Sequence, residues 1–205
     1  MKMSDATPYS TRPEGERARE AQCFRDILSG AVRPELVLET FGGIGDTTAV
    51  LEELWPGVST VATELDPSTA EMYRARHDAT GHPVFNHDAL AFDWAGAIPD
   101  SVSTLGIVLD YNLLTLKRLR EEGSFVRRIL EAVPVERANW ITVTDAAIGK
   151  FHLNKASYGA TDWEEYIWLL HTELEGLLNA RGGNWNLAAV SKHSRAAYLR
   201  MDRRD

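Results

Sequence analysis

Residues 35–46, with the sequence Glu-Leu-Val-Leu-Glu-Thr-Phe-Gly-Gly-Ile-Gly-Asp, join a short apolar run to a glycine-rich turn. The apolar run predicts a buried β-strand that ends near Phe41, and the pattern from Thr47 to Leu54 predicts a helix directly after the glycines. Glycines let a ligand approach the backbone closely, and the free N–H groups of the helix start point toward it. A tight strand-to-helix turn without a ligand is the alternative interpretation.

The alternation of strands and helices continues along the chain. We expect further strands at residues 59–64, 83–86, 104–111 and 139–144, and helices at 13–30, 67–77, 116–133 and about 162–180. Two strand-like runs at 186–190 and 196–201 lie too close in sequence for a parallel crossover, so they must form an antiparallel hairpin. These elements predict an α/β fold with a mostly parallel sheet and helices on both faces.

Composition limits the class of protein. The 205 residues, 44% hydrophobic and 25% charged, suit one globular domain, expected over residues 13–205 after a mobile N-terminus at 1–12. The single cysteine, Cys23, excludes a disulfide framework within the chain and a zinc site of several cysteines, and we predict no metal. No run approaches the roughly 18 apolar residues of a membrane helix, and the first residues are too polar for a signal peptide. A cytoplasmic protein without a membrane partner is expected.

The charges around the turn indicate which cofactor fits. Glu64 lies nineteen residues after Gly45 at the end of the second strand, where a carboxylate can accept both hydroxyls of a ribose. In place of the full dinucleotide pattern G-x-G-x-x-G the chain has Gly43-Ile-Gly45-Asp46-Thr-Thr48, and Asp46 would repel a pyrophosphate. There is also no Walker-type phosphate loop. S-adenosylmethionine carries a sulfonium and an amino group and no phosphate, so Glu39 and Asp46 are compatible with it.

The pattern Glu39-x-Phe41-x-Gly43-x-Gly45, followed by Glu64-Leu65-Asp66 after the next strand, resembles motifs I and II of the class I S-adenosylmethionine-dependent methyltransferases. The resemblance covers most of the chain in layout. It implies a Rossmann-like sheet of seven strands in the order 3-2-1-4-5-7-6, with the last strand antiparallel. It also implies S-adenosylmethionine as cofactor and S-adenosylhomocysteine as product.

The resemblance implies roles for eight cofactor-binding residues. The turn from Phe41 to Gly45 would line the methionine and ribose, Glu64 would bind the ribose hydroxyls, and Leu65 would lie against the adenine. Asp88, after the third strand, would accept from the adenine amino group, although a structural cap of the following turn is the alternative. The full implied set is Glu39, Phe41, Gly43, Gly45, Glu64, Leu65, Asp88 and Ala89.

Within this family, residues 36–77 are most similar to DNA cytosine-5 methyltransferases, through FGGIGD and ELDPSTAEMYRARH. Those enzymes need a Pro-Cys pair after the fourth strand, where a thiolate adds to the pyrimidine ring. This chain has Asp110-Tyr111-Asn112-Leu113 there, and Cys23 lies far away in the N-terminal helix. Covalent carbon methylation of cytosine is therefore not supported.

We predict Asp110, Tyr111 and Asn112 as catalytic residues. Their run is loosely similar to the [D/N/S]-P-P-[Y/F] motif of amino-methylating enzymes, but both prolines are absent. Asp110 can orient a target amine or hydroxyl, and Tyr111 can stack on a planar substrate; a turn cap at Asp110 and a core role for Tyr111 are the alternatives. His152, in a polar loop after the fifth strand, and His87 are candidates for a general base.

The partner predicted from these features is a methyl acceptor, with DNA or RNA as the leading class. The basic residues proposed to form an edge are Lys192, His193, Arg195, Arg200, Arg203 and Arg204, together with Arg118, Arg120, Arg127 and Arg128. No segment is long enough for a separate target-recognition domain, so a small molecule or a protein side chain stays open. A non-catalytic binding module and a different nucleotide-dependent enzyme are the other functional classes.

Overall fold

The computed structural model describes residues 14–77, 80–110, 115–145, 159–192 and 196–204 of the chain. The expected mobile segment at 1–12, the candidate catalytic residues Tyr111 and Asn112, and the candidate base His152 lie outside these ranges. Among the described residues, no helix is long and apolar enough to cross a membrane.

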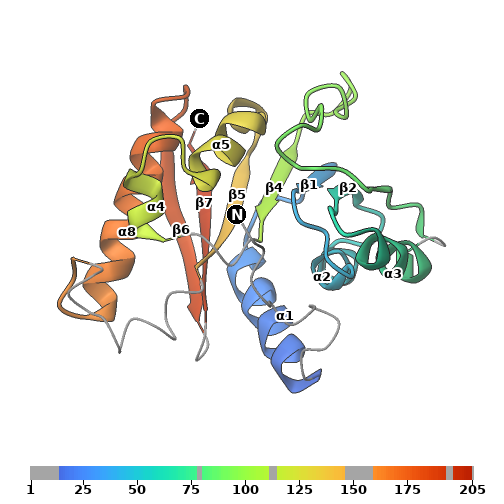
Figure 1. Ribbon diagram of the computed structural model, residues 1–205, viewed down its shortest axis with the longest axis horizontal. Helices are drawn as coiled ribbons and strands as arrows, with labels where there is room; N and C mark the ends of the chain where they lie inside the picture. Colours follow the sequence, from blue (N-terminus) through green and yellow to red (C-terminus); the bar gives the residue numbers. More distant parts are fainter. Residues whose placement is uncertain (1–13, 78–79, 111–114, 146–158, 193–195, 205) are drawn as a thin grey trace.

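Seven strands form one sheet in the order β3-β2-β1-β4-β5-β7-β6 (Figure 1). The strands are β1 (Leu36–Glu39), β2 (Ser59–Thr63), β3 (Val84–Phe85), β4 (Leu105–Leu109), β5 (Trp140–Asp145), β6 (Trp185–Lys192) and β7 (Ala197–Arg203). All neighbours from β3 to β5 are parallel, whereas β7 is antiparallel to both β5 and β6. The structure therefore confirms the predicted strand order and the antiparallel last strand.

Helices cover both faces of the sheet, as predicted. They are α1 (Glu14–Leu28), α2 (Asp46–Leu54), α3 (Pro67–His77), α4 (Leu116–Arg120), α5 (Phe125–Ala132), the 3-10 helix η3 (Val135–Arg137) and α8 (Trp163–Asn179). In β1, Leu36 and Leu38 pack with α4, α5 and α8, whereas Val37 between them packs with α1 and α2. Alternate side chains of a strand point to opposite faces, so β1 is buried on both sides.

The segment expected to be a single helix at 116–133 is two helices, so this expectation was wrong. Helix α4 ends at Arg120, and Gly123 adopts a left-handed conformation with φ +70°. The Ser124 hydroxyl then accepts a hydrogen bond from the Arg127 N–H and caps α5. Glycine ends a helix and serine begins one, whereas the apolar periodicity of the two helices runs on across the break.

Arg200 of β7 ties the end of α1 to the sheet. Its side chain is buried and donates to the carbonyl oxygens of Ile27 at 2.6 Å and Ser29 at 3.1 Å, and its guanidinium also pairs with Asp202. Because these carbonyls lack partners within the helix, the arginine satisfies them. One of the arginines expected at a basic edge is therefore a structural residue.

Gly106 of β4 lies against the ring of Trp140, and a Cβ at this position would overlap that ring. We predict that Gly106→Ala lowers the free energy of unfolding by about 1–3 kcal/mol, because two buried strands must move apart. The control is Gly176→Ala, at an exposed position of α8 with open space around it, which should raise stability by about 0.5–1 kcal/mol. Urea unfolding measures both variants, and a Gly106→Ala protein as stable as the wild type would contradict this packing.

Candidate functional site

The candidate site lies at the carboxyl ends of the neighbouring strands β1 and β4. Strands β2 and β3 continue on one side of this point and β5, β7 and β6 on the other, so the strand order reverses here. In open α/β sheets, ligands bind in the crevice outside the carboxyl ends of the strands at such a point. Glu39 ends β1, Glu64 follows β2 and Asp110 follows β4, so the fold brings these three acidic residues to one edge.

The glycine turn between β1 and α2 is held by backbone hydrogen bonds and by close packing. The Gly42 N–H donates to the Thr63 carbonyl at 2.8 Å, and the Gly45 N–H donates back to Gly42 at 2.9 Å. Gly45 has φ +81°, and a Cβ there would overlap the imidazole of His77. Glycine is therefore required at position 45 by both conformation and space.

The Glu64 carboxylate bridges the glycine turn and the start of α3. Its Oε2 accepts from the Gly43 N–H at 3.0 Å and its Oε1 accepts from the Asp66 N–H at 2.9 Å. Each carboxylate oxygen has a second lone pair, so these bonds leave capacity for two ribose hydroxyls. Leu65 beside it is 61% exposed and offers an apolar surface at the same edge. Both residues therefore suit the adenosine roles that the sequence predicted.

Asp88 and Ala89 follow β3 at the same edge. Asp88 is exposed, and its Oδ1 accepts from the Leu90 N–H at 2.9 Å, which is the turn-capping role weighed as the alternative. The Ala89 side chain is buried, and its carbonyl accepts from the indole N–H of Trp94 at 2.8 Å. Asp88 thus has a structural role in the described fold, and its contact with an adenine stays a prediction.

Glu39 lies beneath the glycine turn and is 1% exposed. The Thr48 hydroxyl donates to its Oε2 at 2.7 Å, and the same hydroxyl lies 2.7 Å from the Tyr73 hydroxyl. Burial raises the pKa of Glu39 to about 8, and the nearby charge of Asp110 adds to this, against the opposing effect of the Thr48 hydrogen bond. At neutral pH the protonated form of Glu39 predominates, so it supports the turn from below as a neutral group.

Asp46, at the start of α2, is compensated by positive charges. Arg76 of α3 pairs with its carboxylate, and a guanidinium nitrogen of Arg17 from α1 lies 3.8 Å away. The sequence interpretation, in which Asp46 repels a phosphate group, therefore needs correction. A choice of cofactor must be argued from the sheet order and from Glu64 instead.

Asp110 lies directly after β4 and is partly exposed. Its charge contributes to the raised pKa of Glu39, which places the two carboxyl groups in the same crevice. Cys23, in contrast, packs in α1, where burial raises the pKa of its thiol. No cysteine therefore stands where a thiolate nucleophile would be needed, as the sequence indicated.

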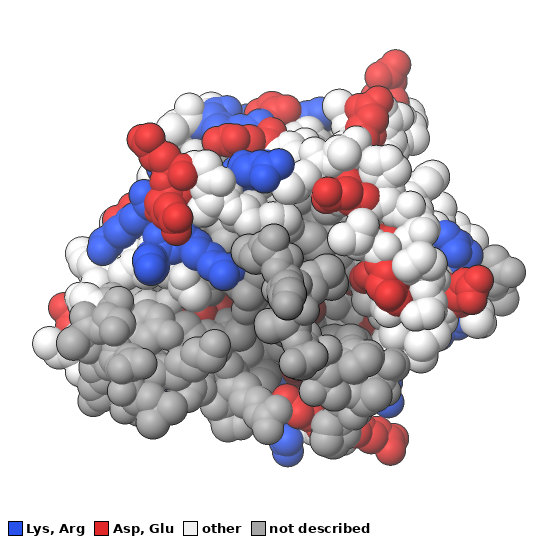
Figure 2. Space-filling model, viewed as in Figure 1, with Lys and Arg blue, Asp and Glu red and all other residues white. Residues whose placement is uncertain are grey.

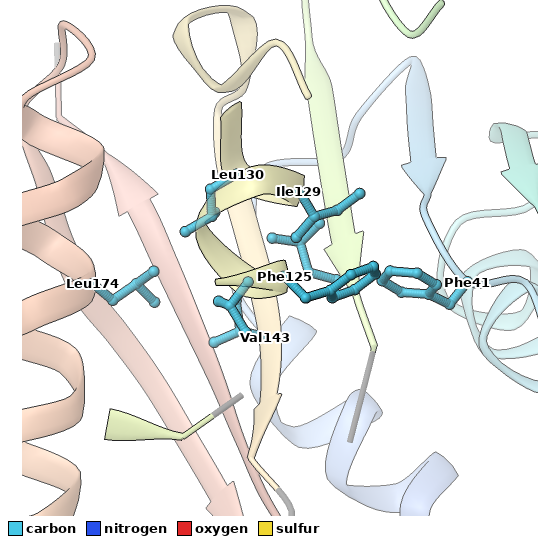
Figure 3. Close-up of a pocket in the computed structure, with 8 residues that line it drawn as sticks. Phe41, Phe125, Ile129, Leu130, Val143 and Leu174 are labelled. Atoms are coloured by element: carbon cyan, nitrogen blue, oxygen red, sulfur yellow. The ribbon is translucent and has the colours of Figure 1, made fainter. Parts of the chain in front are cut away.

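An apolar cavity next to the glycine turn was missed by sequence reasoning. It is lined by Phe41, Leu109, Phe125, Val126, Ile129, Leu130, Val143 and Leu174 (Figure 3). The rings of Phe41 and Phe125 face each other with centroids 5.9 Å apart. The lining residues come from the turn, two strands and two helices, so only the fold brings them together. The signal available in the sequence was the apolar face of residues 125–130.

Four of the arginines predicted to form a basic edge are engaged within the protein, whereas His193 and Arg195 of that prediction lie outside the described residues. Arg120 pairs with Glu173 at 2.6 Å, and Arg204 donates to Asn186 at 2.7 Å. Arg203 donates to the carbonyl oxygen of Glu136. Lys and Arg side chains on the face shown in Figure 2 lie in small groups among Asp and Glu. The charge pattern of the described residues on this face therefore gives little support to a phosphate-binding surface.

Comparison with solved structures shows that the chain has the fold of class I S-adenosylmethionine-dependent methyltransferases. Magnesium protoporphyrin IX methyltransferase ChlM from Synechocystis PCC 6803, with bound S-adenosylhomocysteine, is 11% identical with a TM-score of 0.56, over 93% of this chain and 84% of that chain. The putative methyltransferase YhhF from Escherichia coli is 14% identical with a TM-score of 0.54, over 98% of this chain and 91% of that chain.

The O-methyltransferase NcsB1 from neocarzinostatin biosynthesis was solved with S-adenosylmethionine and 2-hydroxy-5-methyl naphthoic acid. It is 18% identical, with a TM-score of 0.52, over 92% of this chain and 56% of that chain. The chain spans 41% of the length of EvdMO1 and 53% of the mitomycin 7-O-methyltransferase MmcR. No protein-family model matches the sequence, and no curated protein matches it significantly.

We predict that Glu39→Gln changes how stability depends on pH. Between the usual pKa of about 4.5 and the folded-state pKa of about 8, folded wild-type protein holds a proton that the unfolded chain releases, so stability falls as pH rises. Glutamine cannot ionise, so the variant lacks this loss. The free energy of unfolding of the variant, taken relative to that of wild type, should therefore rise by about 1–3 kcal/mol from pH 5.5 to pH 8.

Urea unfolding at pH 5.5, 6.75 and 8 tests this expectation. The matched control is Glu71→Gln on the exposed surface of α3, which should leave the pH dependence of the wild type unchanged. Parallel stability curves for wild type and Glu39→Gln would show that Glu39 is ionised in the folded protein.

Proposed function

We propose that this protein is an S-adenosylmethionine-dependent methyltransferase that acts on a nitrogen or oxygen atom of a small molecule. The observation that carries the proposal is the sheet order with its antiparallel β7, combined with a glycine turn tied to Glu64. Dinucleotide-binding sheets typically have the all-parallel order 3-2-1-4-5-6, so this topology favours a methyltransferase over a nicotinamide enzyme. Structural neighbours with S-adenosylmethionine or S-adenosylhomocysteine bound support the same cofactor.

The residues present fit an adenosine-bearing cofactor without phosphate. Glu64 has lone pairs free for the ribose hydroxyls, Leu65 offers an apolar surface for the adenine, and Gly43 has no side chain to limit the approach of the methionine part. The sulfonium of S-adenosylmethionine supplies an electrophilic methyl group when it is bound. The protein must then hold the acceptor in line with that methyl group and keep water away.

The acceptor is best argued from the surroundings of Phe41. This residue belongs to the glycine turn and is partly exposed, so its ring offers an apolar surface beside the cofactor. The cavity that it lines has a volume of only about 20 Å³, room for about one water molecule, so the surface of Phe41 and not the cavity would contact an acceptor ring. Two neighbours have small molecules in their names: NcsB1 was solved with 2-hydroxy-5-methyl naphthoic acid, and MmcR is named as a mitomycin 7-O-methyltransferase. Because four arginines of the expected basic edge bind partners within the protein, we favour a small apolar acceptor over DNA or RNA.

Asp110 is the proposed positioning group for the acceptor. It lies directly after β4, near enough for its charge to raise the pKa of Glu39, and its carboxylate can accept a proton from an amine or hydroxyl. The lone pair of the acceptor then forms the new bond to carbon as the carbon–sulfur bond breaks. Tyr111 and Asn112 are proposed to complete the acceptor site.

We predict that Glu64→Ala weakens S-adenosylhomocysteine binding about 10–100-fold, because the ribose hydroxyls lose a charged acceptor worth roughly 1.5–3 kcal/mol. Isothermal titration calorimetry measures the change. Glu71→Ala, the removal of an exposed glutamate on α3, serves as the matched control and should bind like wild type. Equal affinity of the Glu64→Ala and wild-type proteins would mean that the ribose lies elsewhere.

We predict that Asp110→Asn binds S-adenosylhomocysteine like wild type but transfers methyl groups about 100-fold more slowly, since the amide is a poor proton acceptor. Transfer of radiolabelled methyl from S-adenosylmethionine to metabolite, protein, DNA and RNA pools measures activity. Label in the metabolite pool supports the proposed acceptor, whereas label in nucleic acid would overturn it. Binding without any transfer would instead indicate a non-catalytic binding module.

A further inference from the structure

A buried histidine contacts the last residue of the glycine turn. His77 is the last residue of α3 and is 2% exposed. Its Nε2 lies 2.9 Å from the carbonyl oxygen of Gly45. Because a carbonyl can only accept, Nε2 carries the proton of this hydrogen bond. The same ring fills the space in which a Cβ of residue 45 would lie, so it fixes the turn by contact as well as by hydrogen bonding.

The other nitrogen of the His77 ring faces the carboxylate of Glu52, whose side chain is 26% exposed. Its Nδ1 lies 3.6 Å from Glu52 Oε2, and Nε2 of His82 lies 2.7 Å from Glu52 Oε1. His82 thus neighbours the same carboxylate without touching the turn. Among the described residues, no group of three histidine, cysteine or acidic side chains is arranged to hold a metal ion. Glu52 thus contacts both histidines, and His77 is the one of the two that also contacts Gly45.

The surroundings of His77 favour its neutral form. Burial lowers the pKa of His77 below its usual value, and Arg76 and His82 act in the same direction, whereas the Gly45 hydrogen bond and Glu52 oppose them. The ring of Tyr73 packs on it with centroids 4.9 Å apart. A neutral ring with its proton on Nε2 has one orientation that satisfies the Gly45 carbonyl.

We propose that His77 is a positioning residue that holds the Gly42–Gly45 turn in its ligand-binding conformation through the carbonyl of Gly45. This carbonyl also accepts from the Ala49 N–H in the first turn of α2, so the imidazole fixes the junction between turn and helix. The junction in turn sets the Gly43 N–H against Glu64. The effect on cofactor affinity rests on the proposed function, whereas the effect on the turn does not.

Four proteins of full length separate the positioning role from simple packing. In glutamine the side-chain nitrogen stands the same number of bonds from Cβ as Nε2 does in histidine, so His77→Gln can keep the donor. His77→Leu fills the space without a donor. His82→Leu removes the contact between His82 and Glu52 and leaves the contact between His77 and Gly45 in place. The fourth protein is the wild type.

Amide hydrogen exchange followed by NMR is the first measurement. In His77→Leu we expect the Gly43 and Gly45 amides to exchange at least about ten-fold faster relative to the β1 amides of Val37 and Leu38. His77→Gln should restore most of the protection, and His82→Leu should leave the ratio as in wild type. An unchanged ratio in His77→Leu, or an equal loss in His82→Leu, would overturn the proposal.

The imidazole nitrogens of the wild-type protein give a second measurement that needs no variant. Their NMR shifts at pH 7.5 should show a neutral ring protonated at Nε2; protonation at Nδ1 would overturn the proposal. Calorimetry should then show S-adenosylhomocysteine binding about ten-fold weaker in His77→Leu and recovered in His77→Gln. Absence of binding by the wild type would refute the proposed function alone, because the exchange pattern decides the role of His77 independently.

Discussion

The hydrogen bond from the Gly43 N–H to the Glu64 carboxylate is the contact on which the candidate site depends. It joins the turn after β1 to the residue after β2, and the second carboxylate oxygen joins both to the start of α3. Two adjacent parallel strands therefore present their carboxyl ends as one rigid edge. The same carboxylate keeps lone pairs directed to solvent, which is what recognition of a ribose requires.

Two of the acidic groups around this contact are compensated by their surroundings. Burial raises the pKa of Glu39 to about 8, and Asp46 is paired with Arg76 and Arg17. The shape of the turn is set by the packing of Tyr73 and His77 from α3 against Gly42 and Gly45. The proposed binding of S-adenosylmethionine at this edge therefore rests on shape and hydrogen bonding more than on the electric field of nearby charged side chains.

Local patterns predicted much of the fold. Helix α3 spans Pro67–His77 as expected, because proline begins it and the glycine-containing loop follows it. The strand order was predicted through the family resemblance and is confirmed. The split between α4 and α5 was missed because the apolar periodicity continues across Gly123, so the glycine and Ser124 were the better signal.

The residues proposed for the site could be named from the sequence, whereas their surroundings could not. Glu64 and the glycines are local features of the sequence, whereas the partners of Asp46 come from α1 and α3 and depend on how the helices cross. The apolar cavity beside Phe41 and the support of Gly45 by His77 likewise join residues far apart in the chain. Such contacts follow from tertiary packing, which no single run of residues records.

A crystal structure of the protein with S-adenosylhomocysteine tests the central claim most directly. We predict that the adenosine lies over the carboxyl ends of β1 and β2, with both ribose hydroxyls donating to Glu64 and the sulfur directed toward Asp110. A ligand bound elsewhere, or a ribose that does not contact Glu64, would contradict the account.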